Sequence, residues 1–270
     1  MKNTRIIFCG LCINIENNVT NLKRRFEHLG QYFKDYRVII FENDSKDNTR
    51  ELLKKICLDN NKFILLECED AKDCKYNNVI AKDYGIFNSK RMYKMITYRN
   101  KLLNYIKNNY NHFDIVCMID LDITGPISID GIAHSFGKYN NWDSITANGI
   151  SGITFTLGQQ YYYDLIAYKD NNLDINNNIF DIISIFYKLN TIKIGKELLK
   201  VKSAFGGMEL IKMYIINNNI NYTPIDNNYK CEHIIFHENM IRNNYSNIYI
   251  NPSMIILVGL QGNEKYLYVY

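Results

Sequence analysis

The sequence predicts an α/β protein whose central, mostly parallel sheet is flanked by helices. Three observations lead to this expectation. Apolar segments of strand length alternate with amphipathic segments of helix length through the first half of the chain. The composition, 47% hydrophobic and 22% charged, is typical of a globular domain and excludes a disordered chain. Acidic turns follow two of the apolar segments, as expected where parallel strands end at a ligand site.

The first half is predicted to contain four strands and three helices in alternation. The strands are expected at Arg5–Ile13, Arg37–Phe41, Phe63–Leu66 and Ile115–Ile119. The helices are expected at Asn17–Leu29, Thr49–Leu58 and Arg91–Tyr110. Because parallel strands need crossover connections, which are usually helices, this order predicts a Rossmann-like sheet.

The second half has a less regular pattern. Strands are expected at Ser144–Ala147 and Tyr162–Tyr168, and helices at Phe180–Leu189 and Gly207–Ile216. No linker rich in Pro, Gly or Ser separates the two halves in the sequence. We therefore expect a single domain over residues 1–270, in which the second half continues the same sheet.

Charge and cysteine content restrict the possible partners. A net charge of +4 is too small to indicate nucleic acid, although its sign suits a phosphate-bearing ligand. No apolar run has the roughly 18 residues of a membrane span.

The seven cysteines are scattered, and the Cys9-x-x-Cys12 motif has no second pair, so buried thiols are favoured over zinc or redox use. A reducing, cytoplasmic setting is the default expectation, and the oligomeric state stays open.

Two carboxylates follow the short apolar strand that ends at Ile119, in the order Asp120-Leu121-Asp122. Like charges at this spacing repel each other unless something positive lies beside them. Mg²⁺ or Mn²⁺ with a bound diphosphate would meet that need, because these ions prefer oxygen ligands. The alternative is that Asp122 caps the following turn and Asp120 is merely exposed to solvent.

Four segments together resemble a known family. They are Phe41–Thr49, Asp120–Asp122, Ser203–Gly207 and Cys231–His237. In this order they look like the motifs of nucleotide-sugar glycosyltransferases with the GT-A fold. Within that fold the chain is similar to fungal capsule-associated α-1,3-mannosyltransferase-like proteins and to glycosyltransferases of large DNA viruses. The resemblance extends from Arg5 to about Pro252.

The resemblance implies a metal-dependent enzyme that moves a sugar from a UDP- or GDP-sugar to a glycan hydroxyl, in viral or cell-surface glycan synthesis. Asp122 would coordinate Mn²⁺ or Mg²⁺, and Asp120 would contact the ribose or a metal-bound water. A late histidine usually completes the metal shell in this family. His237 is the first choice and His233 the second, and the competing interpretation is a histidine buried in the core.

For the nucleotide, the resemblance implies contacts from the turn after the second strand and from the long helix. Glu42 and Asp44 would lie near the base and ribose, although this turn can also cap the next helix. Arg99 and Asn100 match a pair that such enzymes aim at the nucleotide. Arg91 lies roughly two turns earlier and suits a diphosphate. The alternative is that this helix is simply basic and solvated.

For the sugar and the chemistry, the resemblance points to the loop with Gly206 and Gly207, which would let the backbone approach the donor sugar. Glu232 would be the base that deprotonates the acceptor, and Glu209 is the alternative. A base is required only if the reaction inverts the configuration of the sugar. The sequence does not decide between inversion and retention.

Residues 1–125 are expected to bind the donor and residues 126–270 the acceptor. Asp164 lies in a recurring family segment and is a possible acceptor contact. Aromatic residues that could stack on sugars, or simply belong to the core, are Trp142, Tyr161, Tyr162, Tyr163 and Phe205.

Two other classes of protein compete with this interpretation. A metal-dependent nucleotidyltransferase should have a glycine-rich phosphate loop after its first strand, and Phe8–Cys12 is a poor match to one. A carbohydrate-binding relative without turnover would not need the acidic and basic residues at the predicted site. Metal-dependent binding of UDP or GDP separates these classes from a transferase and from each other.

Overall fold

The computed structural model describes residues 1–68, 89–154, 159–175, 178–225 and 230–258. The strands are β1 Arg5–Cys12, β2 Asp35–Glu42, β3 Phe63–Leu66, β4 Ile115–Ile119, β5 Ser144–Thr154, β6 Gln159–Tyr162, β7 Leu199–Lys200, β8 Met208–Lys212 and β9 Ile248–Val258. The helices are α1 Val19–Gly30, α2 Thr49–Asp59, α3 Ser89–Tyr110, α4 Ile129–Gly137, α5 Asp181–Asn190, α6 Met213–Asn217 and α7 Glu232–Arg242. Short 3-10 turns occur at η1 Glu16–Asn18, η2 Tyr139–Asn141 and η4 Leu165–Ala167.

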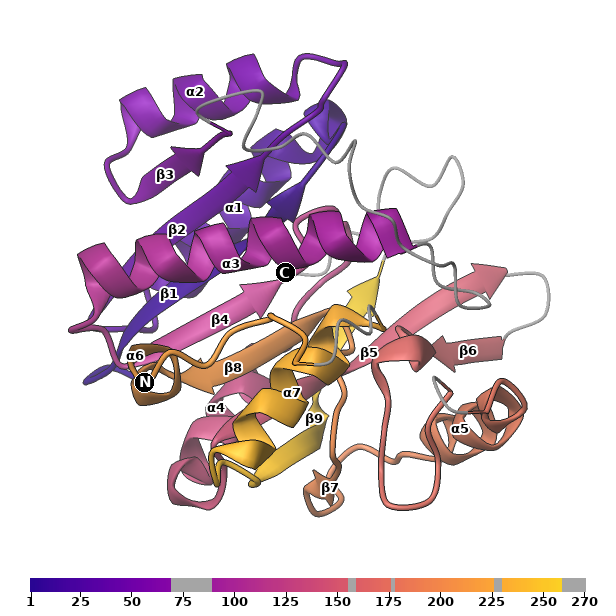
Figure 1. Cartoon of the computed structure of the whole chain (residues 1–270). Coiled ribbons are helices and arrows are strands. Elements are labelled where there is room, and N and C mark those ends of the chain that lie inside the picture. The colour runs from indigo at the N-terminus through magenta and orange to yellow at the C-terminus, as the bar shows by residue number, and fades with distance from the viewer. Residues whose placement is uncertain (69–88, 155–158, 176–177, 226–229, 259–270) are drawn as a thin grey trace.

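One sheet runs through both halves of the chain (Figure 1). Its strand order is β3-β2-β1-β4-β8-β5-β9-β7, and β6 pairs with β5 at the side. The strands β3, β2, β1 and β4 are parallel, whereas β8 runs antiparallel to both β4 and β5. The expected α/β fold class is confirmed, and its parallel part is the one built by alternating strands and helices.

The register of the parallel strands brings their carboxyl ends to one edge of the sheet. Cys12 at the end of β1 pairs with Glu42 at the end of β2. Cys9 pairs with Met118, so β4 ends beside the last residues of β1. The acidic turns after β2 and β4 therefore begin at the same edge, which is where open α/β sheets bind their ligands.

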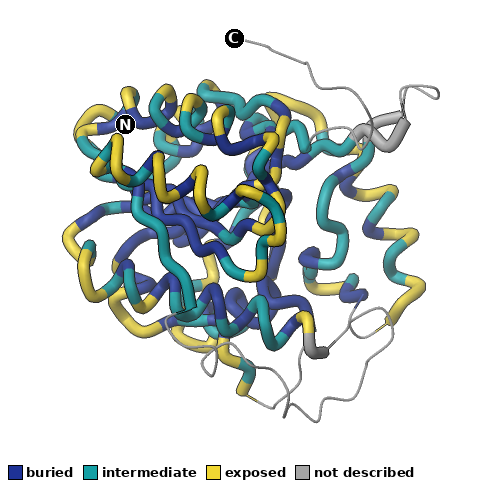
Figure 2. Tube along the Cα trace, turned by 90° about the horizontal axis from the view of Figure 1, so that it is seen from above, coloured by how far each residue is buried: buried dark blue, intermediate teal, exposed yellow. Residues whose placement is uncertain are grey.

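Helices cover both faces of the sheet (Figure 1). In β1, Ile7 and Cys9 face the core layer that contains residues of α3 and α7, and Ile6 and Phe8 face the layer with residues of α1, α2 and α4. Strands that are buried on both faces become continuously apolar, as β4 is over its whole length and β1 is after Arg5. Figure 2 shows the consequence: buried residues fill the interior, and the exposed ones lie on the outer turns of the helices and loops.

Two predictions of secondary structure were wrong. The segment Gly207–Ile216 is not one helix, because its first part is the central strand β8, buried at every residue between β4 and β5. A strand buried on both faces has no two-residue period and cannot be distinguished from a helix by pattern alone. The predicted strand Tyr162–Tyr168 is wrong after its first residue, because Asp164 has φ 65° and turns the chain into η4.

The helix α7 and the long strand β9 were not expected from the sequence. The N-terminus of α7 falls at Glu232, inside the motif segment Cys231–His237, whose helical character the motif does not indicate. Among the helices of the described ranges, none is both long and apolar enough to cross a membrane.

The cysteines differ in part from the expectation. Cys9 and Cys12 are free, and burial raises the pKa of both thiols well above the usual range, so they are inert core residues. Cys68, in contrast, is disulfide-bonded. The cysteines therefore do not by themselves argue for a reducing compartment.

Candidate functional site

The glycine loop before β8 is joined to the end of β4. The backbone N–H of Asp120 donates to the carbonyl of Gly207 at 3.0 Å. A Cβ on Gly206 would lie 2.2 Å from the carbonyl oxygen of Ala147 in β5, so only glycine fits there. The positive φ of Gly206, 61°, adds to this requirement. The loop holds the carboxyl end of β4 against β5 and thereby fixes where Asp120 lies.

Arg99 is the buried centre of a charge cluster at this edge. It comes from α3 and is only 2% exposed. Its Nε lies 3.2 Å from Oε1 of Glu232, and its Nη2 lies 3.6 Å from Oδ1 of Asp120. The guanidinium also packs over the rings of Phe205 and Tyr222. Burial alone would lower the pKa of Arg99, but Glu232, Tyr222 and Asp120 outweigh it, so the side chain stays charged.

One donor of this guanidinium is left over. Nη1 of Arg99 is buried and has no hydrogen-bond partner in the part of the chain that the structure describes. A buried charged donor without a partner is costly, and native proteins rarely leave one unsatisfied. A bound anion at this edge of the sheet would satisfy it.

Carboxylates outnumber the cations around Arg99. Asp120 accepts a hydrogen bond from the hydroxyl of Tyr163 at 3.2 Å. Burial raises the pKa of Asp120 to about 7, with Arg99 opposing the rise and Asp122 adding to it. Burial, followed by the charges of Asp120 and Glu232, raises the pKa of Asp164 to about 8. A cation beside these carboxyl groups would favour their ionised form.

Asp122 is the open carboxylate of the site. Its side chain is exposed, and within the described ranges no hydrogen bond or ion pair holds it. The expected alternative, in which Asp122 caps the following turn, therefore has no hydrogen bond to support it here.

The residues present fit a hard divalent cation that is shared with a ligand. In the described residues no group of three or more His, Cys, Asp or Glu side chains is gathered as a complete metal shell. Mg²⁺ and similar ions are typically held by one or two carboxylates, with phosphate oxygens and water filling the other positions. Asp122 with the neighbouring Asp120 offers that donor set.

The turn after β2 is held together by Glu42. This carboxylate is fully buried, and it accepts from the backbone N–H of Ser45 at 2.9 Å and from Nε of Arg50 at 2.6 Å. Both oxygens are thus used inside the protein. Glu42 thus supports the turn from inside the protein, and its expected contact with the nucleotide stays a prediction.

Asp44 is the exposed carboxylate of the same turn. It has φ 72° and pairs with Lys94 and with the hydroxyl of Tyr98, two residues four apart on α3. Burial would raise the pKa of Asp44, but the hydrogen bonds from Lys94 and Asn43 outweigh it and lower it. The motifs did not single out Lys94 and Tyr98, although their i, i+4 spacing places them on one face of the helix.

The helix-cap alternative holds for a neighbour of Asp44. Oδ1 of Asp47 accepts from the backbone N–H of Thr49 at 3.0 Å, at the beginning of α2. In the acidic turn, Asp47 therefore supports the start of α2, and Asp44 remains the exposed carboxylate.

The other two predicted residues of α3 lie outside the charge cluster. Asn100 donates to Oγ1 of Thr223 at 3.1 Å and accepts from the backbone N–H of Tyr222 at 2.8 Å. Through these two bonds Asn100 fastens a loop to the helix, and its expected contact with the nucleotide stays a prediction. Arg91 is exposed in the first turn of α3, two turns before Arg99.

His237, the first choice for a metal ligand, lies in the core. It is fully buried, with Nδ1 3.0 Å from Oγ of Ser203 and Nε2 2.7 Å from Oε1 of Glu209. Neither ring nitrogen is left for a metal. Glu209 is also fully buried and is bonded to Ser144 as well, so it is a core residue that is shielded from any acceptor.

His233 is a core histidine too. Its ring stacks on Phe205 with 3.7 Å between the centroids. Burial, reinforced by Arg99 and then His237, lowers the pKa of His233 well below its usual range, so it is neutral.

Of the aromatic residues considered for stacking on sugars, Tyr163 is the one that contacts a carboxylate of the charge cluster, through Asp120. Trp142 is buried and donates its Nε1–H to the carbonyl of Ser135. Tyr162 and Phe205 belong to the core, and Tyr161 packs against Phe186 of α5. The core interpretation holds for most of this group.

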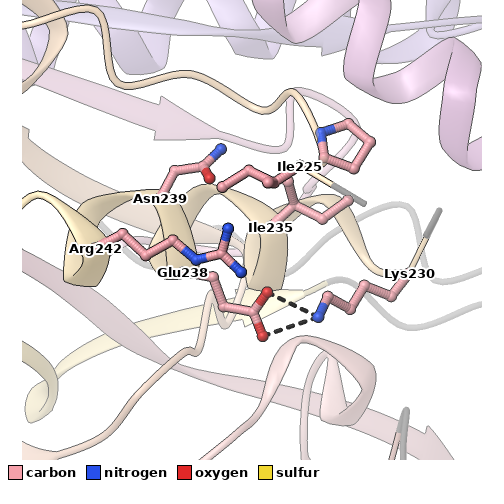
Figure 3. A pocket seen from close by; sticks show the side chains of 7 residues that line it. Ile225, Lys230, Ile235, Glu238, Asn239 and Arg242 are labelled. Carbon is pink, nitrogen blue, oxygen red and sulfur yellow. Dashed lines mark hydrogen bonds and ion pairs between the residues drawn. The ribbon is translucent and has the colours of Figure 1, made fainter. Parts of the chain in front are cut away.

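A small pocket lies on another part of α7 (Figure 3). An ion pair between Lys230 and Glu238, 2.7 Å long, stands at its wall. None of the residues that form the charge cluster lines this pocket. It is therefore separate from the candidate site.

The sheet order and its flanking helices define the class of fold as α/β of the GT-A type. Two solved structures share this architecture. One is S. aureus TarS 1-349 in complex with UDP, which is 14% identical with a TM-score of 0.50. The other is the mannosyltransferase PcManGT from Pyrobaculum calidifontis in complex with GDP-Man and Mn²⁺, which is 11% identical with a TM-score of 0.52.

These likenesses extend over nearly all of the present chain but over only part of the other two. The matches cover 98% and 95% of this chain, and 62% and 57% of the TarS and PcManGT chains. At such low identity the likeness shows the fold alone. The sequence matches no family model and no curated protein.

Proposed function

We propose that this chain is a nucleotide-sugar glycosyltransferase that moves a hexose from a UDP- or GDP-sugar to a glycan hydroxyl. The observation that carries the proposal is the Asp120–Arg99–Glu232 cluster at the carboxyl edge of the sheet, with buried Arg99 at its centre and the open carboxylate of Asp122 beside it. Two proteins of this fold were solved with UDP and with GDP-Man and Mn²⁺, which supports the choice of ligand.

Asp122, with Asp120 beside it, would hold Mn²⁺ or Mg²⁺. When bound, the cation neutralises the charge of the donor diphosphate. The leftover Nη1 of Arg99 is a further donor for an anion, and it is pre-positioned because Asp120 and Glu232 hold the guanidinium. Gly206 and Gly207 form the loop that would face the donor sugar, as the motif resemblance implies, and the close contact of Gly206 with Ala147 fixes this loop against β5.

On the acceptor side, the proposal uses two carboxylates. We assign Glu232 as the general base that an inverting reaction would need. Arg99 fixes the orientation of its side chain. Asp164, in its left-handed backbone conformation, comes from the second half of the chain and would bind the acceptor hydroxyl. Residues 1–125 would then supply the donor site and residues 126–270 the acceptor site.

A panel of UDP- and GDP-sugars with Mn²⁺ tests the proposal, with release of the nucleoside diphosphate as the readout. We expect one donor to be turned over and the Asp122→Ala variant to lose both turnover and metal-dependent nucleotide binding. The matched control is Asp59→Ala, which removes an exposed carboxylate at the end of α2. If the wild-type protein bound neither UDP nor GDP in the presence of Mn²⁺, the proposed function would be wrong.

The acceptor should belong to viral or cell-surface glycans, as the motif resemblance implies. Pyrophosphate release from a nucleoside triphosphate and a sugar phosphate would instead identify a nucleotidyltransferase. Glycan binding without any metal-dependent nucleotide affinity would identify a carbohydrate-binding relative.

A further inference from the structure

The helix α5 lies at the edge of the molecule next to β6 (Figure 1). Its inner face is anchored, because Ile185 and Leu189 are buried and Phe186 packs against Tyr161. Its last residue, Asn190, accepts from the backbone N–H of Tyr162 at 2.8 Å. These contacts fix the inner side of the helix to the protein.

The outer face of α5 is apolar and exposed. Phe180, Ile183 and Tyr187 are 76%, 57% and 67% exposed, and their spacing of three and four residues places them along one stripe. Ile179 before the helix and Ile194 after it are exposed as well. Large apolar side chains gathered in this way usually mark an interaction surface. We call these five residues the α5 stripe.

Positive charge accompanies the α5 stripe. Residues 179–202 contain five lysines against two acidic residues. Lys193 and Lys196 are exposed in the segment that follows the helix directly. A short apolar helix face with lysines beside it is typical of helices that lie in the interface of an anionic membrane.

The α5 stripe is small for a protein partner. A whole aromatic side chain offers about 150–250 Å², so five partly exposed side chains add up to on the order of 500 Å². A stable protein–protein interface buries about 800 Å² on each partner. Insertion into a lipid headgroup layer requires no matching surface and gains further from the lysines.

We propose that the α5 stripe and the lysines after it dock this protein on an anionic membrane surface. The apolar side chains enter the headgroup region, and the lysines contact anionic lipid headgroups. This docking does not depend on the proposed enzymatic function.

Flotation of the full chain with lipid vesicles tests the docking. We expect binding to vesicles of phosphatidylcholine with phosphatidylglycerol, weaker binding to pure phosphatidylcholine, and weaker binding at high salt. The double variant Ile183→Asp with Tyr187→Asp should bind about tenfold more weakly or worse, because two apolar side chains no longer enter the lipid. Leu58→Asp, at an 87% exposed site at the end of α2, should bind like the wild type.

A second variant keeps the test independent of folding in α5. Lys193→Glu with Lys196→Glu leaves the apolar residues in place and should remove the preference for phosphatidylglycerol. The proposal is overturned if the wild type does not float with either vesicle, or if the aspartate variant floats equally well. It is also overturned if the wild type forms oligomers that the aspartate variant dissociates, which would identify a second copy of the chain as the partner.

Discussion

Arg99 and Glu232 lie 133 residues apart in the chain and meet at 3.2 Å inside the protein. Arg99 comes from α3 and Glu232 from the first turn of α7, and both helices lie on the same face of the sheet. The pair unites the two halves of the chain at the edge where β4 ends. A change on either partner should therefore alter stability and the site together.

Arg99→Met should destabilise the protein by about 3–5 kcal/mol, because it leaves the buried Glu232 and the half-buried Asp120 without their counter-ion. Urea unfolding followed by circular dichroism measures this. The control Arg91→Met, at an exposed position on the same helix, should change stability by no more than about 0.5 kcal/mol. Equal effects of the two changes would show that the cluster is not the source of the stability.

Asp122→Ala should leave the fold intact and abolish the effect of Mn²⁺ on nucleotide affinity. The side chain is exposed, and no described residue binds it, so its loss removes no structural contact. Calorimetric titration with UDP and GDP, with and without Mn²⁺, gives the result. A full metal effect in the variant would exclude Asp122 as a ligand.

His237→Phe should lower the free energy of unfolding by about 3 kcal/mol, because it leaves the Glu209 carboxylate buried with fewer donors. Phenylalanine keeps a ring of similar shape in the core. The metal dependence of nucleotide binding should be unchanged, in contrast to Asp122→Ala. If both variants lost it, His237 would be a metal ligand after all.

The pH dependence of stability should reveal Asp164. Its pKa is about 8 in the folded state and about 3.8 in its ordinary range, so the folded protein holds a proton that the unfolded chain releases between these values. The resulting stabilisation is complete below about pH 4 and is lost as the pH rises through 8.

Asp164→Asn removes this titration and keeps a residue that tolerates the left-handed backbone. Without divalent cations, the melting temperature of the variant relative to the wild type should therefore rise between about pH 5 and about pH 9. A difference that does not change with pH would contradict the raised pKa.

Gly206→Ala should be clearly more destabilising than Gly195→Ala. Both glycines have positive φ, 61° and 80°, so each substitution incurs a backbone cost of about 1–2 kcal/mol. A Cβ on Gly206 would meet the carbonyl of Ala147 at 2.2 Å, whereas one on Gly195 would meet nothing within 4 Å. The clash should add about 1–3 kcal/mol. Thermal unfolding compares the two, and similar losses would exclude the tight contact.

The local signals in the sequence were sufficient for the parallel half of the fold. Ile115–Ile119 is predicted and observed as the same five residues, because a strand that is buried on both faces is wholly apolar. The acidic residues after it, Asp120 and Asp122, follow from the same local pattern and lie at the carboxyl edge of the sheet. The hydrophobic period of a strand and the residue types of a turn are properties of a few consecutive residues. The strand and the acidic turn after it could therefore be predicted without knowledge of distant segments.

The tertiary structure alone decided which of the candidate side chains meet. Glu42 and Asn100 lie on the predicted elements, yet both are hydrogen-bonded inside the protein. Glu42 bonds to Ser45 and Arg50. Asn100 bonds to Thr223 and to the backbone of Tyr222. His237 is bonded to Ser203 and Glu209. β8 is a strand because β4 and β5 lie on either side of it. The sequence by itself determined the types of residue at the ends of the strands. Their partners depend on contacts between distant segments, whose free energy no local pattern records.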